Sequence, residues 1–179
     1  ESTAKALAAW FGDLGLIRHL PWPLFKRVPD VGGEVARSVG HFLDQPGNQQ
    51  VIDDLLARGV KVTDTHPPTA KLREGLNLAA LLVDLEIPKV TRIRAEQLGN
   101  AFASAETLVD APVHQFVSAG LPSESASSLA AWLEIPGNAS LLLKAAAAIQ
   151  ALLAAAPETE AATSGPLDGK TVVLTGGLA

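Results

Sequence analysis

A stretch of 22 residues occurs twice in this chain, at positions 90 residues apart. VGGEVARSVGHFLDQPGNQQVI at 31–52 aligns with LPSESASSLAAWLEIPGNASLL at 121–142, and the PGN triplets coincide. Upstream, TAKALAAWF at 3–11 aligns with RAEQLGNAF at 94–102. An internal repeat restricts the chain to two similar structural units. Each unit is predicted to run helix, connection, turn, helix, PGN turn, helix.

Helical patterns dominate both units. The run LLLKAAAAIQALLAAA at 141–156 consists mainly of strong helix formers. After the glycine pair, apolar residues fall at the spacing of one helical face: Val35, Ala36, Val39, Phe42 and Leu43. Hydrophobic residues make up 47% of the chain, which is enough for a core, and cysteine is absent. We therefore expect an all-α fold without disulfides or thiolate metal sites.

Composition also divides the chain into segments. Residues 1–62 and 76–156 carry the two units, and the polar segment 63–75, with its Pro-Pro pair, is predicted to link them. A second linker is predicted at 157–166. The β-branched run within 167–179 is typical of a buried strand, and it predicts the beginning of another domain.

The residues after each PGN turn suggest how the helices there begin and end. Asn48 and Asn138 are expected to cap the helices that follow them. Gly59 is expected to end the first of these helices in a left-handed conformation.

The glycine pair Gly32–Gly33 stands directly before a predicted helix. The first four amides of a helix have no partner within it, and the helix dipole favours an anion at that end. Glycine lets a phosphate approach the backbone closely and permits positive φ. A tight connection between two helices would explain the same dipeptide, so the pair alone leaves both interpretations open.

The residues around the pair favour phosphate binding. Pro29, Val31, Gly32 and Ala36 form the pattern P-x-V-G-x-x-x-A, which resembles the helix-hairpin-helix motif that grips the DNA backbone. The resemblance implies that Val31 anchors the hairpin in the core, that amides after Gly32 face a phosphate, and that Ala36 permits close helix packing. ESTAKALAAWFG at 1–12 then resembles the second helix of a similar motif, with Ala4 at the position of Ala36.

Two later segments, 87–98 and 119–133, resemble third and fourth motifs that have lost the glycine. Gly32 corresponds to Thr91 in the third motif and to Pro122 in the fourth. Side chains of the third motif could contact phosphates instead, or they could form a solvated surface of a unit kept for packing. The candidate DNA-binding residues are Val31, Gly32, Gly33, Arg37, Lys89, Thr91, Arg92 and Arg94.

The order of the segments resembles bacterial NAD-dependent DNA ligases. TAKALAAWFGDL, followed by VPDVGGEVARSVGHFLDQPGNQQVIDDLLARGV, resembles their helix-hairpin-helix domain, and GPLDGKTVVLTGGLA resembles the first strand of their BRCT domain. The residues between these two blocks resemble an inserted, degenerate second pair of motifs. The resemblance implies a fold of tandem helix-hairpin-helix motifs that runs into the start of a BRCT domain.

The same resemblance implies a non-catalytic, DNA-binding part of a ligase. Such a part would hold nicked duplex DNA by its phosphate backbone during nick sealing in replication and repair. The K-x-D-G motif, whose lysine takes AMP from NAD in these ligases, does not occur here, and neither does their four-cysteine zinc site. NAD, Mg and Zn would therefore belong to the full-length ligase. Its other domains are the expected protein partners, and the bacterial cytoplasm, at the nucleoid, is the expected location.

Two other interpretations remain open at this point. The units could form a helical protein-interaction module, or an accessory domain of another repair protein. The net charge of −5 argues against nucleic acid, but three of the four cations in 76–156 lie within six residues. Lys144 interrupts the most apolar run, so we expect no membrane partner.

Overall fold

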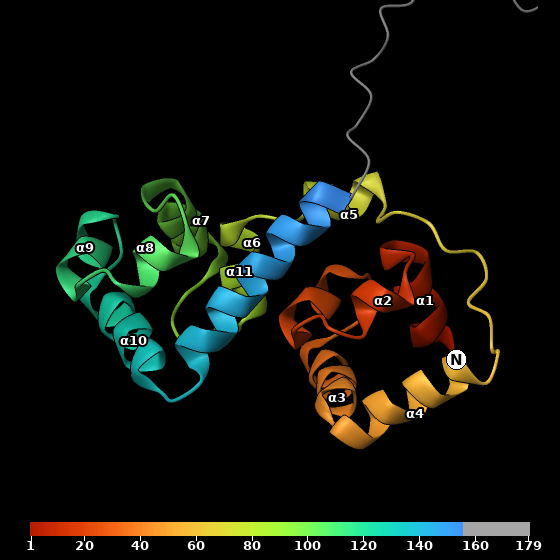
Figure 1. The fold of residues 1–179 in the computed structure, drawn as a ribbon. Coiled ribbons are helices and arrows are strands. Elements are labelled where there is room, and N and C mark those ends of the chain that lie inside the picture. Colours follow the sequence, from red (N-terminus) through yellow and green to blue (C-terminus); the bar gives the residue numbers. More distant parts are fainter. Residues whose placement is uncertain (156–179) are drawn as a thin grey trace, which may run out of the picture.

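The computed structural model describes residues 1–155, which fold into helices with short connections (Figure 1). No strand occurs within this range, so the all-α prediction is confirmed for residues 1–155. The predicted linker at 157–166 and the predicted strand start in 167–179 lie outside the described residues.

The helices form two groups along the chain, which we call the first half and the second half. The first half contains α1 (Ser2–Phe11), α2 (Leu14–Ile17), the 3₁₀ helix η1 (Trp22–Arg27), α3 (Gly33–Asp44) and α4 (Pro46–Ala57). The second half contains α5 (Ala70–Glu74), α6 (Leu78–Asp84), α7 (Arg92–Ala101), α8 (Ala105–Val109), α9 (Val113–Ser118), α10 (Ser123–Glu134) and α11 (Asn138–Ala155). In Figure 1, α11 runs along the second half toward the first half, where it contacts η1.

Three helix pairs, η1–α3, α6–α7 and α9–α10, are joined by hairpins that share two features. We call them the glycine hairpin (residues 28–32), the lysine hairpin (residues 85–91) and the proline hairpin (residues 119–122). Each has a left-handed residue before its last two positions: Asp30 (φ 66°), Lys89 (φ 62°) and Gly120 (φ 106°). The next residue is a buried aliphatic: Val31, Val90 and Leu121. The hairpins thus differ in length, but each ends with a left-handed residue and an aliphatic side chain that anchors it in the core.

An alanine four residues after the N-cap of each hairpin-following helix lets the paired helices pack closely. Ala36, Ala95 and Ala126 are fully buried, and each amide donates to the carbonyl of the N-cap residue at 2.9 Å. A methyl group is the largest side chain that such a close approach leaves room for. The repeat in the sequence therefore corresponds to a repeat in backbone geometry, since α3 and α10 begin and end 90 positions apart.

The asparagines of the PGN turns do not cap the following helices, so that prediction was wrong. α4 begins at Pro46, with Gln45 at its N-cap, and Asn48 Nδ2 donates to the Phe42 carbonyl at 2.8 Å. Asn138 Nδ2 donates in the same way to the Trp132 carbonyl at 2.9 Å. The last carbonyls of a helix have no amide donor within that helix, and the two asparagine amides donate to such carbonyls of the preceding helix. Gly59 does adopt the expected left-handed conformation, with φ 93°.

The segment predicted as a linker, 63–75, includes a short helix. α5 occupies its last part, where the Thr69 hydroxyl accepts from the Leu72 amide at 3.3 Å. Leu72 is buried in the common core, which contains residues of both halves. This part of the segment is therefore held by packing, because an apolar side chain at the right helical position reaches the core.

One described helix, α11, is long and apolar enough by length and composition to cross a membrane. Its buried residues form a single stripe: Leu142, Ala145, Ile149 and Leu152. That stripe packs against α6, α8 and α10. A helix that packs one face in a protein core satisfies the same length and hydropathy criterion, so packing accounts for the apolar stripe of α11.

Candidate nucleic-acid interface

The glycine hairpin presents an open backbone. Gly32 is the N-cap of α3, with φ −79°, and no side chain caps the helix there. A Cβ added to Gly32 would meet no neighbouring atom within 4 Å. Neither glycine of the pair uses the positive φ that glycine permits, because Asp30 takes the left-handed position of this hairpin. Neither packing nor backbone conformation requires glycine at position 32, whereas an approaching anion benefits from it.

The first turn of α3 supplies donors beside this open backbone. The Gly32 carbonyl accepts from the Ala36 amide at 2.9 Å, which is the first bond of the helix. The amides of Gly33, Glu34 and Val35 precede that bond and have no acceptor within the helix. Together with the helix dipole, they favour an anion at this end of α3.

Two cations and one carboxylate lie against this turn. Glu86, from the lysine hairpin, pairs with Lys26 Nζ at 2.9 Å and also with Arg37. A Cβ on Gly33 would lie 2.7 Å from Glu86 Oε1, so the carboxylate takes the space that a side chain at this position would need. The Arg37 guanidinium also lies over the Trp22 ring, 4.5 Å from its centroid. The hydrogen bond from Lys26, with a smaller effect of the one from Arg37, holds the pKa of Glu86 below its ordinary value.

A second ion pair between the halves lies deeper. Arg27 Nη2 donates to Asp84 Oδ1 at 2.6 Å, and Arg27 Nε lies 2.5 Å from Asp84 Oδ2. The Asp84 side chain is only 5% exposed. Burial raises the pKa of Asp84 above its ordinary value, and the hydrogen bond and charge of Arg27 oppose that rise. This fork joins the ends of η1 and α6, from which the glycine and lysine hairpins begin.

The lysine hairpin differs from the glycine hairpin at the helix start. Thr91 is the N-cap of α7, and its hydroxyl accepts from the Arg94 amide in a long bond of 3.5 Å. Lys89 pairs with Glu124 of α10. Arg92 and Arg94 contact Glu96 and Gln97 of their own helix, each at 3.1 Å. The predicted cations of this hairpin are therefore exposed or half-buried, and each already has a polar partner.

The structure brings some of the predicted residues together. Gly32, Gly33 and Arg37 lie in one turn of α3, and Glu86 places the lysine hairpin beside them. Sequence reasoning missed Glu86, which pairs with Lys26. Their ion pair joins residues 60 positions apart, and no local pattern in the sequence indicates such a contact.

The helix that follows the proline hairpin, α10, lies against the lysine hairpin. Ser128 Oγ donates to the Pro88 carbonyl at 2.5 Å, in addition to the Lys89–Glu124 pair. Its N-cap, Pro122, carries no charge and no side-chain cap bond. This arrangement favours a packing role for the proline hairpin.

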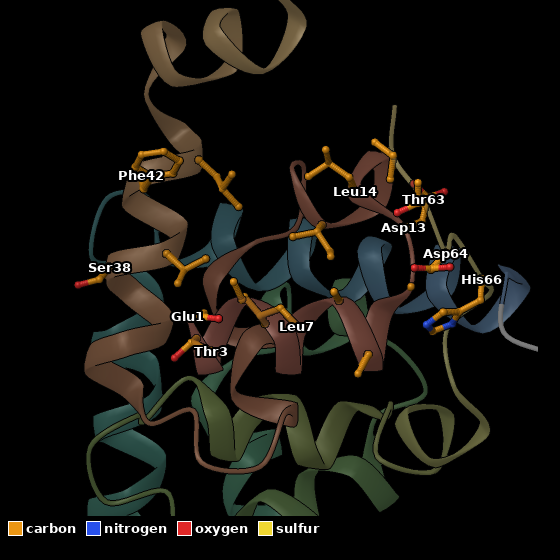
Figure 2. A pocket seen from close by; sticks show the side chains of 18 residues that line it. Glu1, Thr3, Leu7, Asp13, Leu14, Ser38, Phe42, Thr63, Asp64 and His66 are labelled. Atoms are coloured by element: carbon orange, nitrogen blue, oxygen red, sulfur yellow. The ribbon is translucent and has the colours of Figure 1, made fainter. Parts of the chain in front are cut away.

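An apolar hollow of about 820 Å³ lies between α1, α2, α3 and the chain around residues 62–66 (Figure 2). Leu7, Leu14 and Phe42 are among the residues that line it. Ala4, the counterpart of Ala36, also lines it and is exposed. The buried alanine positions of the three hairpin pairs thus have an uncovered counterpart on α1.

Residues 1–155, the part that the structure describes, contain no candidate metal site. Cysteine is absent from the sequence, and within residues 1–155 no group of three His, Asp or Glu side chains could hold a metal ion. The residues described do not fit the zinc or magnesium sites that the ligase resemblance implies for a complete enzyme. No chemical step is therefore assigned to such ions in this chain.

Comparisons with known proteins agree with the hairpin geometry. A family model described as a helix-hairpin-helix motif matches residues 1–52, which include the glycine hairpin. A protein named DNA ligase from Stenotrophomonas maltophilia is 63% identical over 180 residues, and one from Xanthomonas oryzae is 63% identical over 179 residues. A DNA ligase from Xanthomonas campestris is 60% identical over 179 residues. No solved structure matches the chain significantly.

These alignments cover the whole of this chain but only about a fifth of each relative, 22%, 21% and 22% respectively. Because they run over 179 or 180 residues, the second unit at 76–156 is shared with these relatives and is not peculiar to this chain. From its first residue to its last, the chain corresponds to one segment of bacterial proteins named DNA ligase, and that segment begins with a helix-hairpin-helix motif.

Proposed function

We propose that this chain is the DNA-gripping part of an NAD-dependent DNA ligase, which holds nicked duplex DNA by its phosphate backbone during nick sealing. The observation that carries the proposal is the glycine hairpin. Gly32 is open to solvent, no side chain caps α3, and two cations stand beside its first turn. Backbone amides and cations of this kind recognise phosphate without reading base sequence.

The proposed contacts differ between the two hairpins. Amides after Gly32 would bind one phosphate, with Arg37 beside them. In the lysine hairpin, Lys89, Arg92 and Arg94 would contribute by side chain alone. Val31 and Thr91 would position the two turns, since Val31 is buried and Thr91 caps its helix. Such binding weakens with salt, because phosphate contacts release counterions.

The rest of the proposal concerns the protein to which such a segment would belong. Catalysis with NAD, Mg and Zn would reside in other domains of the ligase, which would be the partners of this segment in replication and repair. A BRCT domain would follow it, and the complete enzyme would act in the cytoplasm at the nucleoid. The names of the relatives favour a ligase over an accessory domain of another repair protein.

Exchanging the N-cap residues of the two hairpins tests the proposal. Thr and Gly are similar as N-caps, so Gly32→Thr should leave stability nearly unchanged. The threonine would place a side chain where the phosphate approaches and offer an oxygen to an α3 amide. We expect about tenfold weaker binding to nicked duplex DNA at low salt, the worth of one charge-assisted hydrogen bond.

Thr91→Gly is the matched comparison, because it makes the reverse exchange in the lysine hairpin and removes no charge there; it should weaken binding less than Gly32→Thr does. Fluorescence anisotropy at several salt concentrations measures both variants, with circular dichroism to verify folding. If Gly32→Thr bound DNA as tightly as the unaltered chain, the hairpin mechanism would be refuted.

One observation favours the protein-interaction alternative. α4 has no buried residue, and its apolar side chains Val51, Leu55 and Leu56 are exposed. Exposed apolar side chains gathered on one helix are typical of contact surfaces. Association that persists at high salt and is abolished by Leu55→Glu, with no retention on DNA, would support this function instead.

A further inference from the structure

The Glu86 carboxylate lies where two cations and the first turn of α3 converge. It pairs with Lys26 and Arg37, and it fills the space that a side chain on Gly33 would take, beside the open Gly32 backbone. Carboxylates and phosphates accept hydrogen bonds from the same donors, namely ammonium groups, guanidinium groups and backbone amides. The free chain thus already holds an anionic group at its glycine hairpin.

We propose that Glu86 occupies, in the free chain, the place that a DNA phosphate takes on binding, and that the phosphate displaces it to pair with Lys26 and Arg37. The inference rests on the proposed DNA-binding function. It adds Lys26 to the contact residues and makes Glu86 an internal competitor that sets the affinity of the hairpin.

Exposure makes this exchange feasible. The Glu86 side chain is 43% exposed and that of Arg37 is 49% exposed, so water already reaches both, while the Lys26 side chain is 16% exposed and reaches the surface mainly at the pair with Glu86. Exposed ion pairs hold their partners weakly, and a carboxylate that moves away from them regains hydration. Asp84 differs, since its side chain is almost fully buried against Arg27. The buried fork can keep the two halves together while the exposed pairs open.

The two hairpins also differ in a way that agrees with displacement. At the lysine hairpin the helix start is capped by its own Thr91, and Glu124 contacts Lys89 alone. At the glycine hairpin no residue caps α3, and one carboxylate bridges two cations. An anion that binds the glycine hairpin therefore competes with a single side chain.

The test compares Glu86→Gln in the 179-residue chain with Glu134→Gln, which removes the same charge from the end of α10. Glu134 takes part in no salt bridge found among residues 1–155. We expect Glu86→Gln to bind duplex DNA about two- to thirtyfold more tightly at low salt, the worth of two ion pairs that lie at the surface or are partly exposed. Its salt dependence should stay close to that of the unaltered chain, because Lys26 and Arg37 meet phosphates in both complexes. Glu134→Gln should change neither quantity.

Lys26→Ala identifies the contact. It should weaken binding more in the Glu86→Gln background than in the unaltered chain. In the unaltered chain the substitution removes the Lys26–phosphate contact but also the Lys26–Glu86 pair that competes with it, whereas in the Glu86→Gln background only the phosphate contact is lost. Equal or weaker binding by Glu86→Gln, while the unaltered chain binds DNA, would overturn the inference and leave the proposed function standing. Equal gains from Glu86→Gln and Glu134→Gln would also overturn it, since net charge would explain both. Absence of salt-dependent binding by every variant would refute the proposed function, and this inference with it.

Discussion

The Arg27–Asp84 fork offers the sharpest test of how the two halves are held together. Arg27→Met keeps the length of the side chain and removes its charge, so that Asp84 remains as a buried carboxylate without its partner. Breaking a buried pair from one side costs about 3–5 kcal/mol. Since the Arg27 side chain is 25% exposed, we expect a loss near the lower end, about 3 kcal/mol at neutral pH.

The loss should depend on pH in a defined direction. Burial raises the pKa of Asp84 even with Arg27 present, and without Arg27 it should rise further. A carboxyl whose pKa is higher in the folded state than in the unfolded state binds protons preferentially when folded. The destabilisation therefore shrinks as the pH falls from about 7 toward the raised pKa.

Urea unfolding followed by circular dichroism, at about pH 7 and about pH 5, measures both effects. Asp84→Asn is the matched control, because it removes the buried charge and should cost less than Arg27→Met and vary little with pH. The double variant should recover part of the loss, since no unpaired carboxylate remains. A loss below about 1 kcal/mol, the value of an exposed pair, or an equal loss at both pH values would refute the reasoning.

Further predictions concern packing, capping and acid stability. Gly40→Ala should destabilise the chain by about 1–3 kcal/mol in urea unfolding, because its Cβ would lie 2.6 Å from Trp22 Cβ; an unchanged midpoint would contradict this. Leu142→Ala, in the fully buried stripe of α11, should cost about 2–5 kcal/mol, and a loss under 1 kcal/mol would show loose packing there. Thr91→Ala should cost only about 0.5 kcal/mol, since its cap bond is long. Glu86 should contribute stability above its ordinary pKa of 4.5 and lose it as the pH falls through its lowered folded value, so Glu86→Gln should flatten the acid limb of the melting-temperature curve.

Local structure was predictable because it depends on neighbouring residues. The repeat located α3 and α10, whose ends lie 90 positions apart, and the pattern around Val31 and Ala36 located the glycine hairpin. Local competition also explains the errors. The amide of Asn48 found a nearer partner in the preceding helix, and the left-handed position of the glycine hairpin is taken by Asp30 and not by a glycine. In both cases neighbouring groups compete for the same hydrogen bond or turn position, and the sequence pattern does not indicate which of them takes it.

By itself, the sequence determined the helical class, the repeat and the one hairpin whose backbone is open at Gly32. Only the tertiary structure decided which charges meet. Glu86 reaches Lys26 and Arg37 across 60 and 49 positions, and Arg27 reaches Asp84 across 57. Helix and hairpin signals act within a few residues, whereas ion pairs between elements depend on how those elements pack. The physical reason is that each hairpin has its own local sequence pattern, whereas the position of one hairpin relative to the other is set by the packing of η1 against α6.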